Sequence, residues 1–142
     1  MATTTHLRTA QQTAETTAHH APENRIGDQV RTLLDSRFRV ADQEERRQYK
    51  RHPFPYLLRV QPVDGESLIP CGESLVAVCK QLAEKGIDFY HQSPLPYRYV
   101  IASLQTCSRN WLSFLVVLTW CRFSELGWYE NRGRFLKVID AE

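Results

Sequence analysis

The chain has 142 residues, a net charge of +2 and a pI near 8.4. This length fits one compact domain of ordinary size and leaves little for a second. The composition, with 42% hydrophobic, 24% charged and 11% aromatic residues, is that of a globular protein and excludes the collagenous, disordered and membrane classes. The net charge is too mild for a protein that works on the phosphate backbone of nucleic acids, so we expect no nucleic-acid binding.

The first 24 residues are polar. Their only large aliphatic side chains are Met1 and Leu7, in a background of Thr, Ala, Gln and His. Such a segment buries too little apolar surface to offset the entropy of ordering it, so we expect residues 1–24 to form a disordered tail. No basic region followed by an apolar run is visible here, so the sequence indicates no secretory signal peptide and a cytoplasmic protein.

A helix is expected next. From Arg25 on, apolar residues recur at i, i+4, i+7 and i+8, the spacing of one helical face, and Asn24 is suited to cap the helix N-terminus. The residues on this face are Ile26, Val30, Leu33 and Leu34. We expect the helix to end near Phe38, within a helical N-terminal extension over residues 25–45. An exposed apolar stripe is unfavourable, so this face packs either on the rest of the domain or on a partner, such as a second copy of the chain.

After Pro55 the pattern changes to that of β-structure. Six segments are rich in β-branched and aromatic residues and are bounded by Gly, Pro, Ser, Asn or Asp, which favour turns. They span residues 56–63, 74–81, 86–91, 97–105, 111–123 and 128–138. Turns recur about every ten residues and no helical pattern separates the strands, which is typical of small antiparallel barrels. We therefore predict a mainly β fold, a six-stranded antiparallel β-barrel over residues 46–139.

The segment 111–123 is the most apolar of the six, but it is shorter than the roughly 20 residues that a membrane helix needs, so we expect no membrane insertion. Its alternation predicts which side chains face the barrel interior. These are Leu112, Phe114, Val116, Leu118 and Trp120. Thr119 and Cys121 then belong to the outer face.

The four cysteines are Cys71, Cys79, Cys107 and Cys121. They form no C-x-x-C pair and have no histidine at zinc-ligand spacing, so we expect buried reduced thiols and no metal or other cofactor. Pairing Cys79 or Cys121 with His91 as nucleophile and base lacks a third group that orients the base. We therefore expect no enzyme.

One candidate binding segment is an arginine pair. Arg47 and Arg51 lie four residues apart on an arm before the first strand, and two guanidiniums can hold an anion or hydrogen-bond a guanine edge. Considered alone, the pair is more simply interpreted as part of a solvated, self-paired charge run, because Glu44 and Glu45 lie beside it.

Two further segments are less specific. Residues 81–86 (QLAEKG) join two strands, and considered alone they form a hairpin in which Gly86 supplies the positive φ that the turn requires. Residues 127–135 (GWYENRGRF) form an aromatic strand, whose simplest interpretation is core packing of Tyr129 and Phe135.

In this order and at these separations, the three segments resemble the PilZ domain family. That family combines an R-x-x-x-R arm, a [D/N]-x-S-x-x-G turn, and a closing strand in which an aromatic residue precedes G-x-x-F or a near variant. The resemblance covers residues 46–135. It implies a six-stranded barrel whose outer face binds the bacterial second messenger cyclic diguanylate (cyclic di-GMP). The ligand-binding residues that it implies are Arg47, Arg51, Gln81, Ala83 and Gly86.

Two of these residues depart from the family turn. Gln81 replaces Asp or Asn, and Ala83 replaces Ser and so has no hydroxyl group. Two weakened hydrogen bonds of about 0.5 to 1.5 kcal/mol each lower the affinity by about five-fold to more than a hundred-fold. Lys85, where glycine is frequent, either attracts a phosphate or closes the turn.

Two functions stay open after the sequence analysis. One is a signalling module that binds cyclic diguanylate weakly and relays binding to an unidentified protein partner, in which case the ligand orders the arginine arm. The other is a ligand-independent PilZ-like interaction module, in which the N-terminal helix docks a partner or a second copy. If a base stacks on an aromatic ring, Trp128 is favoured over Trp120 and Tyr129 because its surroundings are polar.

Overall fold

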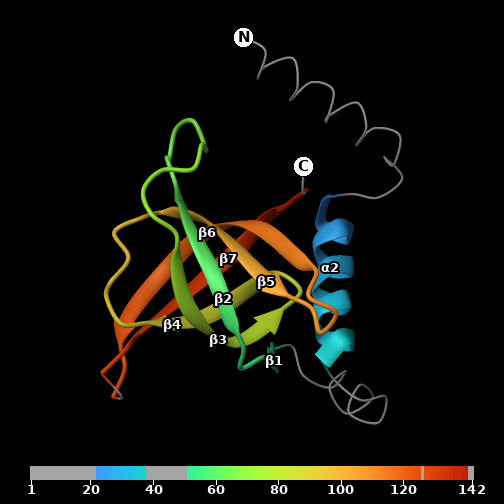
Figure 1. Cartoon of the computed structure of the whole chain (residues 1–142). Helices are drawn as coiled ribbons and strands as arrows, with labels where there is room; N and C mark the ends of the chain where they lie inside the picture. Colours follow the sequence, from blue (N-terminus) through green and yellow to red (C-terminus); the bar gives the residue numbers. More distant parts are fainter. Residues whose placement is uncertain (1–21, 38–50, 126, 141–142) are drawn as a thin grey trace.

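The structure is a computed structural model that describes residues 22–37, 51–125 and 127–140. Within these ranges the chain forms one helix followed by seven strands (Figure 1). The elements are α2 (Pro22–Arg37), β1 (Arg51–Pro53), β2 (Leu57–Val63), β3 (Leu75–Ala83), β4 (Gly86–His91), β5 (Tyr99–Gln105), β6 (Trp111–Phe123) and β7 (Tyr129–Ile139). No helix of the described residues is long and apolar enough to cross a membrane.

Six of the strands close into a barrel. The order around the sheet is β3-β2-β5-β6-β7-β4, every pairing is antiparallel, and β4 pairs back onto β3. This confirms the predicted six-stranded antiparallel barrel, and the bounds of the six strands agree with the prediction to within two residues. The additional strand, β1, pairs with the end of β3 beyond β2. The sequence did not predict β1, because a three-residue segment that ends in a proline is too short to show alternation.

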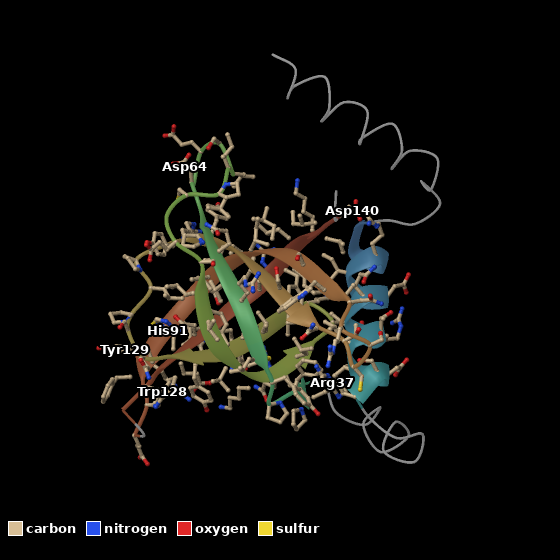
Figure 2. The ribbon with its side chains drawn as sticks, viewed as in Figure 1. Arg37, Asp64, His91, Trp128, Tyr129 and Asp140 are labelled. Carbon is tan, nitrogen blue, oxygen red and sulfur yellow. The ribbon has the colours of Figure 1, made fainter. Side chains whose placement is uncertain are left out.

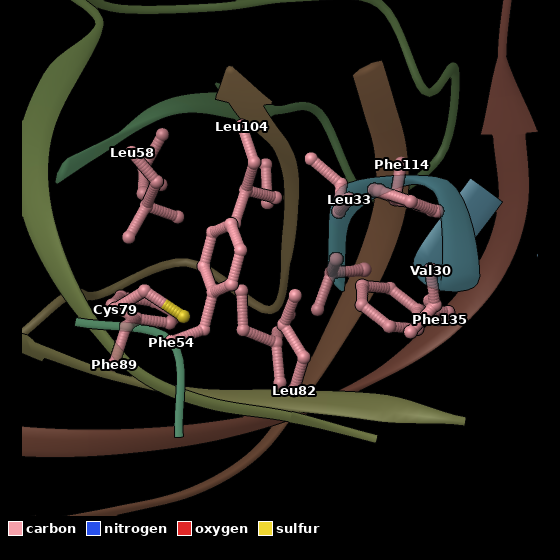
Figure 3. Close-up of a cluster of buried hydrophobic side chains, with 14 of the residues drawn as sticks. Val30, Leu33, Phe54, Leu58, Cys79, Leu82, Phe89, Leu104, Phe114 and Phe135 are labelled. Atoms are coloured by element: carbon pink, nitrogen blue, oxygen red, sulfur yellow. The ribbon is translucent and has the colours of Figure 1, made fainter. Parts of the chain in front are cut away.

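The interior is filled by alternate residues of the strands. In β5, for example, buried and half-buried residues alternate along the whole strand, as expected where one face points into a core. Figure 3 shows this core, with the Phe54 ring among side chains from several strands. Fully buried members include Leu58, Leu82, Ile87, Phe89, Leu104, Phe114 and Val116.

Helix α2 closes one end of the barrel. Near its first turn Arg25 is paired with Asp140, just beyond β7, and at its last turn Arg37 donates a hydrogen bond of 2.8 Å to the Gln105 carbonyl at the end of β5. Its apolar face joins the barrel core, where Val30 and Leu33 lie beside Phe114 (Figure 3). Of the two predicted alternatives for this face, the structure therefore shows packing on the domain itself.

The helix begins earlier than predicted. Residues 22–24 belong to α2 and not to the predicted tail, because Pro22 is well tolerated in the first turn of a helix, where its missing N–H needs no partner. The rest of the predicted disordered tail, residues 1–21, and the rest of the helical extension, residues 38–45, lie outside the described residues.

The structure corrects two predictions, one on strand β6 and one on the cysteines. Leu112, Phe114, Val116 and Leu118 pack in or against the core as expected, but Trp120 does not, because the pairing with β7 shifts by a bulge between Leu118 and Trp120. An extra residue at a bulge moves the following side chains to the other face. The prediction of buried thiols is also wrong for three of the four cysteines. All four are free, but only Cys79 is buried.

The approach of β4 to β7 corrects the role given to Gly86. The left-handed glycines are Gly72 and Gly127, so Gly86 does not supply a positive φ. Instead, a Cβ on Gly86 would lie closer than 3.0 Å to the carbonyl oxygen of Gly133 in the neighbouring strand. Gly86 is therefore required by close backbone packing between these two strands.

Candidate functional site

One row of side chains crosses four neighbouring strands on the outer face of the barrel. The strand register places Gln81 of β3 opposite Asp88 of β4, Asp88 opposite Arg132 of β7, and Arg132 opposite Trp120 of β6. Arg51 of β1 joins the row because it pairs with Ala83, two residues beyond Gln81 on the same face of β3. We refer to Arg51, Gln81, Asp88 and Arg132 as the Asp88 cluster.

Asp88 is the centre of this cluster. Its side chain is fully buried, yet it accepts hydrogen bonds from three of the residues that the structure describes. Arg132 donates twice, from Nε to Oδ1 at 2.9 Å and from Nη2 to Oδ2 at 3.4 Å. Arg51 donates once, from Nη1 to Oδ2 at 3.2 Å, and the Gln81 amide donates to the same oxygen. A buried carboxylate requires such partners, because an unpaired charge out of water is very costly.

A second carboxylate lies next to the first on the same face. Glu130, two residues before Arg132 on β7, is buried and pairs with Lys80 (Nζ to Oε2, 3.1 Å) and Arg122 (Nη2 to Oε1, 3.3 Å). The hydrogen bond that Lys80 donates to Glu130 is the main cause that raises the pKa of Lys80 above its ordinary value. Lys80 is thus held in its charged form.

Trp120 lies between these two groups of charges. The guanidinium carbon of Arg132 is 4.7 Å from the centroid of the Trp120 ring, and that of Arg122 is 5.1 Å from it. Both distances are within the range of cation–π attraction. The contacts fix the ring on the outer face beside Arg132, at the end of the row.

The face as a whole can bind an anion. Four cationic side chains, Arg51, Lys80, Arg122 and Arg132, share two carboxylates, which leaves an excess of positive charge. Arg134, two residues beyond Arg132 on β7, is exposed and forms no ion pair with any residue that the structure describes. Guanidiniums favour phosphate through paired N–H donors, and an indole ring beside them offers a face for a nucleobase.

Solvent reaches this face. The side chains of Arg51 and Arg132 are 37% and 35% exposed, although the carboxylate between them is buried. The apolar side of helix α2 packs at the end of the barrel. The guanidiniums are therefore accessible to a ligand while they hold Asp88.

The residues predicted from the sequence are distributed unevenly over this site. Arg51 and Gln81 lie in the Asp88 cluster, and Ala83 lies opposite Arg51 in the β1–β3 pair. Gly86 is buried beneath the Gly133 carbonyl and acts through packing. Arg47 lies outside the described residues.

The sequence patterns did not indicate Asp88 or Arg132, and the alternation of residues 111–123 placed Trp120 in the core. A signal for Asp88 was present, since a single acidic residue between Ile87 and Phe89 in an apolar strand must find a charged partner once buried. No such signal marked Arg132.

Trp128, which was favoured for stacking, lies elsewhere on the barrel. Its backbone belongs to the β6–β7 hairpin, where the Trp128 carbonyl accepts a hydrogen bond from the Ser124 amide. Figure 2 shows it with His91 and Tyr129 at the end of the barrel away from α2. Trp120 is therefore the tryptophan beside the Asp88 cluster.

Cys79 does not fit the role of a nucleophile. Burial, followed by the nearby charge of Asp88, raises the pKa of its thiol far above the ordinary value, so the reactive thiolate is not formed near neutral pH. Among the described residues, no three His, Cys, Asp or Glu side chains are grouped so that they could hold a metal ion.

No family model, curated protein or solved structure matches this chain. A small antiparallel barrel alone does not indicate a function, because such folds carry many unrelated sites. The residues of the outer face are therefore the basis for inferring a function.

Proposed function

We propose that this chain is a cytoplasmic PilZ-like signalling module that binds cyclic diguanylate weakly on its outer face and relays binding to a protein partner. The observation that supports it is the convergence of Arg51, Gln81 and Arg132 with Trp120 in one accessible row across four strands. Two of these residues, Arg51 and Gln81, are ligand-binding positions that the resemblance implies.

The chemistry of the face suits a nucleotide with two phosphates. Arg51, together with Arg47 of the preceding arm, would hold phosphate oxygens or guanine edges. The surplus positive charge would attract the dianion, and Trp120 would receive a base. The affinity is low in this proposal because Ala83 offers no hydroxyl group and the Gln81 amide already donates to Asp88.

The relay follows from the position of Arg51. It stands at the start of β1 and is bound across to β4 through Asp88. A ligand that engages both arm arginines would draw the arm onto the barrel and so change the surface that a partner meets.

The test is calorimetric titration of the full chain with cyclic diguanylate at low and physiological salt. We expect weak binding that decreases with salt and is lost in Arg47→Ala and Arg51→Ala. Arg59→Ala is a matched control, because Arg59 carries the same charge on the outer face of β2 but lies against Trp111, outside the Asp88 cluster. Equal loss of binding in Arg59→Ala and Arg51→Ala would contradict a specific site.

A second candidate, a ligand-independent interaction module, is favoured by the same two departures at Gln81 and Ala83. Restoring the family turn with Gln81→Asn and Ala83→Ser distinguishes the two functions. For a receptor, the double variant binds cyclic diguanylate about ten-fold more tightly or better, through two regained hydrogen bonds. If neither the parent chain nor this variant gives a binding heat at millimolar ligand, the interaction module replaces the receptor.

A further inference from the structure

Asp88 occupies the donors that an anionic ligand needs. Among the described residues, Arg51, Gln81 and Arg132 direct N–H groups at its carboxylate, which is the arrangement that binds a phosphate group. We propose that Asp88 is an internal counter-anion that competes with a ligand phosphate for Arg51. This inference rests on the proposed function and adds to it a residue that sets affinity and ligand class.

The geometry distinguishes the two arginines. Arg132 holds Asp88 through two nitrogens on both carboxylate oxygens, at 2.9 and 3.4 Å, whereas Arg51 makes a single contact at 3.2 Å. Asp88 cannot turn to solvent, because it is fully buried. A ligand can therefore recruit Arg51 at the cost of one contact, while Arg132 and Gln81 keep the carboxylate satisfied.

This competition selects among ligands. A ligand with a single phosphate exchanges one anion for another at Arg51 and gains little. A ligand with two phosphates can also use charges that Asp88 does not occupy, such as exposed Arg134 on the same face of β7. The internal carboxylate thus favours a multiply charged phosphodiester over a mononucleotide.

The test compares the parent chain with Asp88→Asn and Glu130→Gln. Glu130→Gln is the matched control, because it removes one negative charge from a second buried carboxylate on the same face without freeing Arg51. Cyclic diguanylate and inorganic pyrophosphate are the probes, measured by calorimetry, and circular dichroism establishes that each variant is folded.

We expect Asp88→Asn to bind cyclic diguanylate about ten-fold or more tightly than the parent, since one charge-assisted hydrogen bond no longer competes. Glu130→Gln should give a clearly smaller gain. An equal gain in both variants would mean a general charge effect, and weaker binding in Asp88→Asn would mean that Asp88 positions the arginines for the ligand. Either result overturns the proposal.

Two further readouts separate this inference from the proposed function. If no variant binds cyclic diguanylate, the proposed function fails, and pyrophosphate binding then tests the role of Asp88 by itself. Tighter pyrophosphate binding to Asp88→Asn than to the parent chain supports an internal counter-anion, and equal binding to the two refutes it. If Asp88→Asn does not fold, side-chain NMR of the parent chain decides. Pyrophosphate should shift the Arg51 Nε–H resonance more than that of Arg132, and the reverse order would contradict the proposal.

Discussion

The close approach of β4 and β7 makes Gly86→Ala a direct test of why this glycine is present. A Cβ at this position would lie closer than 3.0 Å to the Gly133 carbonyl oxygen, a separation that such atoms essentially never show. The obstacle is backbone in a paired strand, since Ile87 is the register partner of Gly133. The methyl group therefore fits only if the two strands move apart.

The expected loss of stability follows from that geometry. Overpacking a well-packed site costs about 1 to 3 kcal/mol, and the stiffer unfolded chain of the alanine variant returns about 0.4 to 1 kcal/mol. The overpacking cost should lie in the upper half of its range, because the obstacle is backbone. We therefore expect a net loss in the free energy of unfolding of about 2 kcal/mol. For a domain of this size the loss lowers Tm by about 8 °C. The variant should remain folded, because domains are typically stable by about 5 to 15 kcal/mol.

Urea denaturation and calorimetry measure this loss. Gly65→Ala is the matched control, because its nearest neighbour would be the Tyr99 ring at 3.8 Å and its φ is not left-handed. We expect Gly65→Ala to change stability by less than about 0.5 kcal/mol. If Gly86→Ala is as stable as this control, the packing argument for Gly86 is wrong.

The remaining predictions concern the helix, the thiols and one carboxylate. Leu33→Asp places a charge in the core and should unfold a monomeric chain, as measured by circular dichroism and sedimentation. Thr32→Asp, on the exposed face of the helix, should leave the chain folded. Dissociation of a folded dimer in Leu33→Asp would contradict the docked helix. Iodoacetamide at pH 8 should modify the exposed Cys71 and Cys107 and, more slowly, Cys121, because partial desolvation raises the pKa of the Cys121 thiol. It should reach the buried Cys79 only after unfolding. Mass spectrometry that shows four adducts on the native chain would refute this prediction. Hydrogen bonds from Ser67, and a weaker one from the Glu66 amide, lower the pKa of Asp64. The contribution of the Asp64 carboxylate to stability is therefore fully present above the unfolded pKa of about 3.9 and is lost as the pH falls through the lower folded pKa. NMR titration of Asp64 should show a low midpoint, and the midpoint should rise in Ser67→Ala.

The secondary structure could be predicted from the sequence because it depends on local patterns. Alternation and turn residues located all six barrel strands to within two residues, and the 3.6-residue period located the buried face of α2. Arg51 and Gln81, in contrast, were named because three short motifs at fixed separations resemble the PilZ domain family.

The site itself depends on which strands become neighbours. Asp88 is far from Arg132 and Trp120 in the sequence, and the three residues meet only because β4, β7 and β6 pair in one particular register. A single bulge before Trp120 moves that ring from the predicted core to the outer face, and a carbonyl of β7 is the reason for Gly86 in β4. The periodicity of one strand indicates what that strand buries as long as its pairing is regular. Pairing, register and bulges are set by contacts across the whole barrel, so only the tertiary structure decides where that pattern is interrupted and which charges the strand faces.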